Sequence, residues 1–316
     1  MSFSTDVKED ILTYNSEKKL HSTEFVAMLR FGGEVLVSPV LKIVFSTSSS
    51  MVFRHFLMYL KELYSEATYQ MFSRTMQKLH HSTIYTCMIE QEALTIAEAV
   101  HLLEDFPPDK ETILADPMQM IAYLRGAFLV KGTVNNPSTS NYHLEIAAAK
   151  ETEALFLQRC MNAFSLNARI SKRRNDLIVY IKEKDAIVDF LRYLGANVSM
   201  NEFENVIIKR NLAANINRLM NIDVANQQKT NQTAKEQLKY IKYLEYYYPL
   251  EKLDPKLLLV MKVRKENPEA SFSELIAIIN QNYDESITKS GLNHRFRKIK
   301  EIAQQHENKR KEASWK

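Results

Sequence analysis

The feature that most constrains the fold of this chain is an internal repeat within its first two hundred residues. One copy begins with "FVAMLRFGGEVLV" at Phe25, and the other begins with "LRGAFLVKGTV" at Leu124. Each copy runs helix, strand, strand, helix, strand, strand, helix. Alternating runs such as "LKIVFS" and "YHLEIA" are typical of half-buried strands, whereas "MVFRHFLMYLKEL" places apolar residues at helical spacing. A pair of copies indicates a pseudo-two-fold αββαββα domain rather than a solenoid, which needs more repeats.

Glycine placement supports this repeat. The chain holds only six glycines, and four of them lie in the first helix of each copy or at its end: Gly32, Gly33, Gly126 and Gly132. Gly33 and Gly132 are placed as helix C-caps, a position that glycine favours. Gly126 lies more than a turn earlier, so capping does not explain it. We expect it to let two helix backbones approach closely, which offsets the roughly 1 kcal/mol cost of a helical glycine relative to alanine.

Residues 205–250 are predicted to form a helical linker. The segment is rich in Asn, Gln and Lys and holds no glycine. The pattern predicts one helix from Val206 to about Met220 and a second from Thr230 to about Tyr247. Prolines on either side of a short stretch then mark a boundary.

The remaining residues have the pattern of a three-helix domain. Asp254 is placed to cap a first helix that has Pro255 at its first position, and Ser271 and Glu274 are spaced as a capping box for the second. The third helix carries an apolar stripe of Leu292, Phe296, Ile299 and Ile302. The predicted fold class is α+β, with a duplicated domain, a helical linker, an all-α domain and a charged tail expected to fray or be disordered, over residues 1–204, 205–250, 251–305 and 306–316.

Charge is divided unevenly along the chain. Residues 203–316 carry 21 Lys and Arg against 14 Asp and Glu, which leaves 21 and 24 of the totals of 42 and 38 for residues 1–202. The C-terminal part is therefore net +7 and the rest net −3. This asymmetry suggests that an anionic partner meets the C-terminal part, although basic tails are often only solvated.

The last two helices have the signature of a DNA-binding helix-turn-helix: a short helix, a tight turn and a second helix with a polar, basic face. Asn and Arg side chains can hydrogen-bond base edges in the major groove, and Lys and Arg can neutralise phosphates. The predicted DNA-binding residues are Ser273, Glu274, Thr288, Lys289, Ser290, Asn293, His294, Arg295, Arg297, Lys298 and Lys300. The alternative is a three-helix bundle with a solvated basic face. A second basic cluster, Lys172, Arg173 and Arg174, lies at a predicted hairpin tip, where a phosphate contact and a plain solvated turn both stay open.

The two repeat helices raise the question of nuclease chemistry. Nucleases with such a helix pair place an acidic residue at the foot of each helix and hold a divalent metal there. The corresponding stretches here are "RFGGE" and "FLVKGT", and neither a glycine nor a lysine side chain chelates magnesium. Glu34 lies one step past the helix end. The sequence therefore predicts no catalytic residue, no bound metal and no cofactor, and a metal-dependent endonuclease is the alternative.

Several segments together resemble the WhiA family: "SFSTDVKEDI", "YLRGAFLVKGTVNNP", "YHLEI", "EFENVIIKRNLAANINRLMNIDVANQQKT" and "ITKSGLNHRFRKIKEIA". The resemblance covers nearly the whole chain in the right order. It implies an N-terminal domain similar to LAGLIDADG homing endonucleases and a helix-turn-helix similar to that of sigma factor region four. The endonuclease nonapeptide then falls on Phe25 to Gly33 and on Leu124 to Gly132, which puts its acidic positions at Gly32 and Lys131. Both are degenerate, since neither residue is acidic.

The resemblance implies a non-enzymatic transcriptional regulator that binds double-stranded DNA and acts in cell division and chromosome segregation, with a role in sporulation in some relatives. Another transcription regulator or RNA polymerase is a further expected partner. The polar start "MSFSTDVKED" lacks a signal-peptide layout, and no apolar run reaches the roughly 20 residues that cross a bilayer. We therefore expect a cytoplasmic, nucleoid-associated protein without membrane contact. A protein-interaction scaffold with an incidental basic tail is the second alternative, and the oligomeric state stays open.

Overall fold

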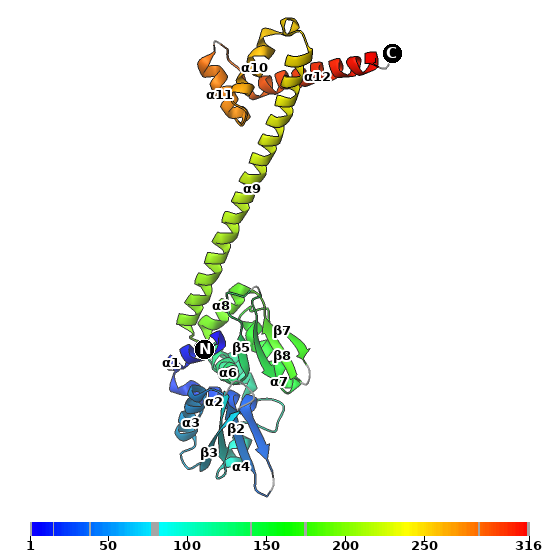
Figure 1. Ribbon diagram of the computed structural model, residues 1–316. Coiled ribbons are helices and arrows are strands. Elements are labelled where there is room, and N and C mark those ends of the chain that lie inside the picture. Colours follow the sequence, from blue (N-terminus) through cyan, green and yellow to red (C-terminus); the bar gives the residue numbers. More distant parts are fainter. Residues whose placement is uncertain are drawn as a thin grey trace. The chain divides into compact units, whose positions relative to one another are not determined.

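The computed structural model of the chain describes residues 2–14, 16–37, 39–76, 82–139, 141–173, 176–283 and 285–314 (Figure 1). The chain forms two compact units, Met1–Asn211 and Leu212–Lys316. The N-terminal unit combines helices with two four-stranded sheets, and the described part of the C-terminal unit is helical. The predicted α+β class is confirmed. None of the described helices combines the length and the apolar character required to cross a membrane.

The N-terminal unit contains the predicted repeat. The first copy comprises α2 (Lys18–Gly32), β1 (Gly33–Leu36), β2 (Lys42–Thr47), α3 (Ser50–Leu63), β3 (Tyr69–Met76), β4 (Ser82–Ile89) and α4 (Ala93–Ala99). The second comprises α6 (Pro117–Lys131), β5 (Gly132–Val134), β6 (Leu144–Ala148), α7 (Glu151–Ala163), β7 (Arg169–Arg173), β8 (Asp176–Ile181) and α8 (Lys184–Tyr193). Their antiparallel sheets have the equivalent strand orders β1-β2-β4-β3 and β5-β6-β8-β7. Two further helices, α1 (Phe3–Thr13) and α5 (Lys110–Ala115), precede the copies.

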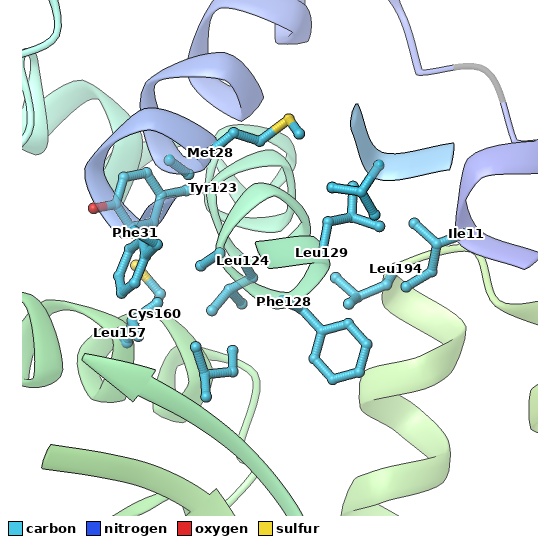
Figure 2. Close-up of a cluster of buried hydrophobic side chains, with 14 of the residues drawn as sticks. Ile11, Met28, Phe31, Tyr123, Leu124, Phe128, Leu129, Leu157, Cys160 and Leu194 are labelled. Carbon is cyan, nitrogen blue, oxygen red and sulfur yellow. The ribbon is translucent and has the colours of Figure 1, made fainter. Parts of the chain in front are cut away.

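The first helix of each copy, α2 or α6, lies at the centre of this unit. The two helices pack against each other along their length. Figure 2 shows that the buried side chains of α6 project to different sides of the helix, among them Tyr123, Leu124, Phe128 and Leu129. A helix with apolar side chains on every face is expected to be enclosed on all sides, because burying each face removes hydrocarbon from water.

Glycine allows the close approach of these two helices. A Cβ added at Gly126 would overlap the carbonyl oxygen of Glu24 and lie 2.8 Å from the Cβ of Ala27. The predicted role of Gly126 in close packing is therefore confirmed. Gly33 and Gly132 follow the helices with extended backbones, φ −94° and −79°, and continue directly into strands. They do not adopt the left-handed cap conformation that makes glycine favourable at helix ends.

One helix, α9 (Asn197–Tyr247), replaces the two helices predicted for the linker. It has 51 residues, and the predicted break between Met220 and Thr230 is wrong. The segment lacks glycine and proline, and Asn and Gln side chains at exposed positions do not interrupt a helix. Both ends of α9 are buried in a core: Phe203 lies in that of the N-terminal unit and Leu244 in that of the C-terminal unit.

The C-terminal unit contains three further helices, α10 (Pro255–Glu266), α11 (Phe272–Asn282) and α12 (Lys289–Ser314), after the 3₁₀ turn η1 (Leu250–Lys252). Asp254 accepts a hydrogen bond from the Lys256 amide at 2.8 Å and caps α10. The predicted capping box of Ser271 and Glu274 is present at the start of α11. The three predicted helices and their two N-terminal caps are therefore confirmed.

The predicted fraying of residues 306–316 is wrong for residues 306–314, which continue α12. Side chains of α9 hold this extension in place. The Tyr243 hydroxyl lies 3.1 Å from Nδ1 of His306, and the Arg310 guanidinium lies over the Tyr247 ring at 3.8 Å. Cation–π and hydrogen-bond contacts of this kind compensate the ordering of a terminal segment. Residues 315–316 lie outside the described residues.

Candidate nucleic-acid interface

The buried stripe of α12 fixes which of its faces is turned outward. Leu292, Phe296 and Ile299 are buried, and Phe296 stacks on Phe272 of α11 with ring centroids 5.6 Å apart. Ile302 is partly buried. The predicted apolar stripe is confirmed, and the residues on the opposite side of α12 must face solvent because a helix repeats every 3.6 residues.

The turn between α11 and α12 is held by a residue that the sequence analysis missed. The side-chain oxygen of Asn280 accepts from the Ile287 amide at 2.7 Å, and its amide nitrogen donates to the Ile287 carbonyl at 3.2 Å. Thr288 then caps α12 by accepting from the Gly291 amide at 3.2 Å. An Asn close to a helix end and ahead of a polar turn was the only available signal for this role. Asn280 therefore sets where α12 begins.

Ten of the predicted DNA-binding residues are exposed: Ser273, Glu274, Thr288, Lys289, Ser290, Asn293, His294, Arg297, Lys298 and Lys300. The structure brings four of them onto one strip of α12. Lys289, Asn293, Arg297 and Lys300 follow one another at helical spacing. Ser290, His294 and Lys298 form the neighbouring strip at the same spacing. An amide and a guanidinium flanked by ammonium groups are the donors that base edges and phosphates accept.

Arg295 is the one predicted DNA-binding residue of α12 that is partly buried. Its guanidinium pairs with Glu285, and the two side chains are only 15% and 18% exposed. The hydrogen bond from Arg295 holds the pKa of Glu285 below its usual range. The position borders the buried stripe of α12, which explains why its side chain turns toward the protein.

Glu274 is exposed, but its side chain has a structural role. Its carboxylate accepts the Ser271 amide at 2.6 Å, and this backbone hydrogen bond lowers the pKa of Glu274. A carboxylate at a helix N-terminus is favourable because it opposes the helix dipole. Glu274 therefore caps α11, and base recognition needs other side chains.

The second basic cluster lies on β7, an edge strand of its sheet. Lys172 and Arg173 are exposed, and Arg173 forms an ion pair with Glu145 at 3.2 Å. Arg174 lies outside the described residues. The carboxylate of Glu145 offsets part of the positive charge that the described part of this cluster offers to a phosphate.

The feet of α2 and α6 meet at a small cavity of about 170 Å³, lined by residues that include Gly32, Glu34, Lys131 and Asp176. A Cβ added at Gly32 would lie 2.7 Å from both the Phe45 ring and Cγ1 of Val130. An acidic side chain therefore does not fit at position 32 with these neighbours in place.

A buried ion pair lies beside this cavity. Arg30 and Glu153 both line it, and their side chains are 3.2 Å apart and almost fully buried. Burial raises the pKa of Glu153 against the opposing effect of Arg30. Within the described residues, no group of three or more His, Cys, Asp or Glu side chains is arranged to hold a metal ion. The donor set does not fit the divalent metal that a LAGLIDADG nuclease requires.

Comparison with known proteins confirms the predicted resemblance. The family model described as the WhiA LAGLIDADG-like domain matches residues 120–213, and that of the WhiA C-terminal HTH domain matches residues 216–303. The probable cell division protein WhiA of Enterococcus faecalis is 34% identical, covering 96% of this chain and 98% of its own length. The probable cell division protein WhiA of Lactobacillus gasseri is 36% identical, and the match covers 96% of this chain and 98% of that protein. The crystal structure of full-length DUF199/WhiA from Thermatoga maritima has a TM-score of 0.60 at 25% identity and covers 96% of this chain and 99% of that one. The chain belongs to the WhiA family.

Proposed function

We propose that this protein is a DNA-binding transcriptional regulator that reads double-stranded DNA through α12. The observation that carries the proposal is the strip of Lys289, Asn293, Arg297 and Lys300, which is exposed on the flank of the buried stripe of the same helix. Asn293 and Arg297 would contact base edges, and the lysines would contact phosphates. The net +7 charge of residues 203–316 favours association with a polyanion.

The N-terminal unit would act as a non-catalytic scaffold. Gly32 and Lys131 supply no carboxylate, and packing around Gly32 leaves no room for one. This argues against the alternative of a metal-dependent endonuclease. The exposed Lys172 and Arg173 could add backbone contacts, and Arg174 belongs to the same predicted cluster; otherwise this unit would dock another transcription regulator or RNA polymerase.

The biological setting would be cell division and chromosome segregation, since the curated relatives named above are probable cell division proteins. A role in sporulation belongs to the same proposal for some relatives. The protein would act in the cytoplasm, associated with the nucleoid. The other alternative, a protein-interaction scaffold with an incidental basic tail, predicts that the outward strip of α12 is irrelevant to DNA.

Genome-wide occupancy of the tagged protein, followed by binding of the full chain to an occupied duplex, tests the proposal. The Asn293→Ala/Arg297→Ala double variant should lose preference for that duplex over an unrelated one. Ala substitution of Glu301, exposed on α12 outside the strip, is the matched control. Unchanged preference in the double variant would instead support the scaffold alternative.

A further inference from the structure

A groove of about 580 Å³ lies in the C-terminal unit, beside the helix-turn-helix. Its walls come from four helices. The lining includes the first turn of α11 and the side chains of Asn226, Lys229, Thr230, Thr233, Arg264 and Lys289. Two of these residues, Asn226 and Lys229, fall within the stretch where the sequence pattern had predicted a break.

The groove is cationic. Among the described residues, no Asp or Glu side chain lines it. Lys229 of α9 and Lys289 of α12 are both exposed, and neither forms an ion pair with any described residue. Two ammonium groups that converge from different helices without a carboxylate between them favour an anion in the groove.

Arg264, which lines this groove, is a buried cation without a counter-ion among the described residues. It is only 1% exposed, and its hydrogen bonds go to neutral acceptors. Nε donates to the Gln237 side chain at 3.0 Å, and Nη1 donates to the carbonyls of Asn267 and Ala270 at 3.3 and 2.6 Å. Nη2 has no hydrogen-bond partner in the described part of the chain. Burial lowers the pKa of Arg264. The guanidinium also lies over the Phe296 ring, 5.6 Å from its centroid, but this ring carries no net charge. A buried cation without a counter-ion is unfavourable, so an anion in the groove would supply one.

The remaining polar groups suit phosphate oxygens. Asn226, Lys229, Thr230 and Thr233 repeat at helical spacing and so share one face of α9. Thr233 donates its hydroxyl proton to the Lys229 carbonyl at 2.8 Å, which leaves Asn226 and Thr230 as the neutral donors that α9 contributes. Lys289 belongs both to this groove and to the outward strip of α12, so the two surfaces are continuous.

We propose that this groove binds a phosphate group of the DNA backbone, so that α9 forms part of the DNA interface together with α12. The inference rests on the proposed function, because it places the phosphate in a duplex that α12 holds. Phosphate contacts position a protein on DNA without reading its sequence. Lys229 would therefore contribute equally to the binding of any duplex.

The test measures binding of the full chain to a fluorescent duplex over a series of NaCl concentrations. The Lys229→Gln variant should bind both an occupied and an unrelated duplex more weakly, and the slope of log affinity against log salt should fall by about 0.9 for the one lost phosphate contact. Lys229→Arg should keep the slope. Lys235→Gln is the control, since Lys235 is exposed on the same helix, lies outside the groove and has no ion pair with a described residue. Circular dichroism confirms that each variant is folded.

The binding data distinguish a failure of this inference from a failure of the proposed function. If the wild type binds duplex with a steep salt slope and Lys229→Gln matches Lys235→Gln, the inference is overturned and the proposed function stands. If the wild type binds no duplex, both fall together. Calorimetry with inorganic phosphate distinguishes the source of the anion. Phosphate binding that Lys229→Gln abolishes, with the duplex slope unchanged, would assign the groove to a free anion and overturn the DNA contact.

Discussion

Nε of Arg125 in α6 lies 3.1 Å from Oε1 of Glu24 in α2, and both side chains are buried between the two helices. The Glu24 carboxylate also accepts from the Tyr59 hydroxyl at 3.1 Å and lies 3.0 Å from Nε2 of His55. Arg125 in turn donates to the carbonyls of Ile11 and Tyr14 at 2.9 and 2.7 Å. A fully hydrogen-bonded ion pair thus joins the two copies of the repeat.

Removing one partner of this pair is expected to be strongly destabilising. Arg125→Met leaves the Glu24 carboxylate buried without its cation, which should lower the free energy of unfolding by roughly 3–5 kcal/mol. Urea denaturation measures the change. Lys19→Gln, which breaks the exposed pair with Glu17, is the control and should leave stability nearly unchanged because solvent screens this pair. Equal effects of the two substitutions would contradict the account.

The same pair predicts how stability depends on pH. Burial acts to raise the pKa of Glu24, but the His55 hydrogen bond and the charge of Arg125 outweigh it, so the folded-state pKa is lowered. Glu24 therefore stabilises the fold above its unfolded pKa of about 4.3, and this contribution is lost as pH falls through the lower folded pKa. The difference in unfolding free energy between wild type and Glu24→Gln should shrink below about pH 4.3. A difference that stays constant in acid would count against this pairing.

Gly126→Ala tests the close approach of α2 and α6. Alanine favours a helix, yet the added methyl overlaps the Glu24 carbonyl, so the variant should lose roughly 1–3 kcal/mol of stability. At Gly291 the nearest atom to an added methyl is Cγ1 of Ile287, at 3.3 Å. Gly291→Ala should therefore lower stability less than Gly126→Ala does. Thermal unfolding of both variants compares the two sites. A Gly126→Ala protein as stable as wild type would mean that the helices pack less closely.

Arg295 and Arg297 form a matched pair for the DNA interface. Arg297 is exposed on the outward strip, so Arg297→Gln should weaken binding to an occupied duplex by about 1–3 kcal/mol. Arg295 is paired with Glu285, so Arg295→Gln should chiefly reduce thermal stability. Anisotropy titrations and melting curves separate the two effects. A larger loss of DNA affinity from Arg295→Gln would reverse the assignment of the two residues.

The endonuclease alternative has a direct test in supercoiled plasmid with Mg²⁺. We expect the full chain to retard the plasmid and leave it uncut, because neither Gly32 nor Lys131 is a metal ligand. The Gly32→Asp/Lys131→Asp double variant should also fail to cut, since its first new side chain meets Phe45 and Val130. Nicking by the wild type that EDTA prevents would establish the nuclease.

The sequence pattern was informative wherever one face of an element is buried. The strands show this well: Leu144, Ile146 and Ala148 of β6 are buried, and the residues between them are partly exposed. The middle of α9 lacks such a pattern because residues 211–229 are exposed on every side, and the polar residues there led to the prediction of a break. The ion pair of Arg295 could not be predicted for a related reason, since its partner Glu285 comes close only after the turn has folded.

The packing above Gly32 has a consequence for how this protein could change over time. Phe45 is fully buried and stacked on Phe56 at 3.8 Å, so it cannot swing aside to admit a longer side chain at position 32. An acidic residue introduced at position 32 or at position 131 alone does not chelate a metal ion. Introducing the one at position 32 first lowers the stability of the fold. Any mutational path to a metal-binding pair must therefore also shrink a neighbour. The packing of Phe45 and Val130 around position 32 is therefore a steric barrier to any variant that would bind a metal ion there.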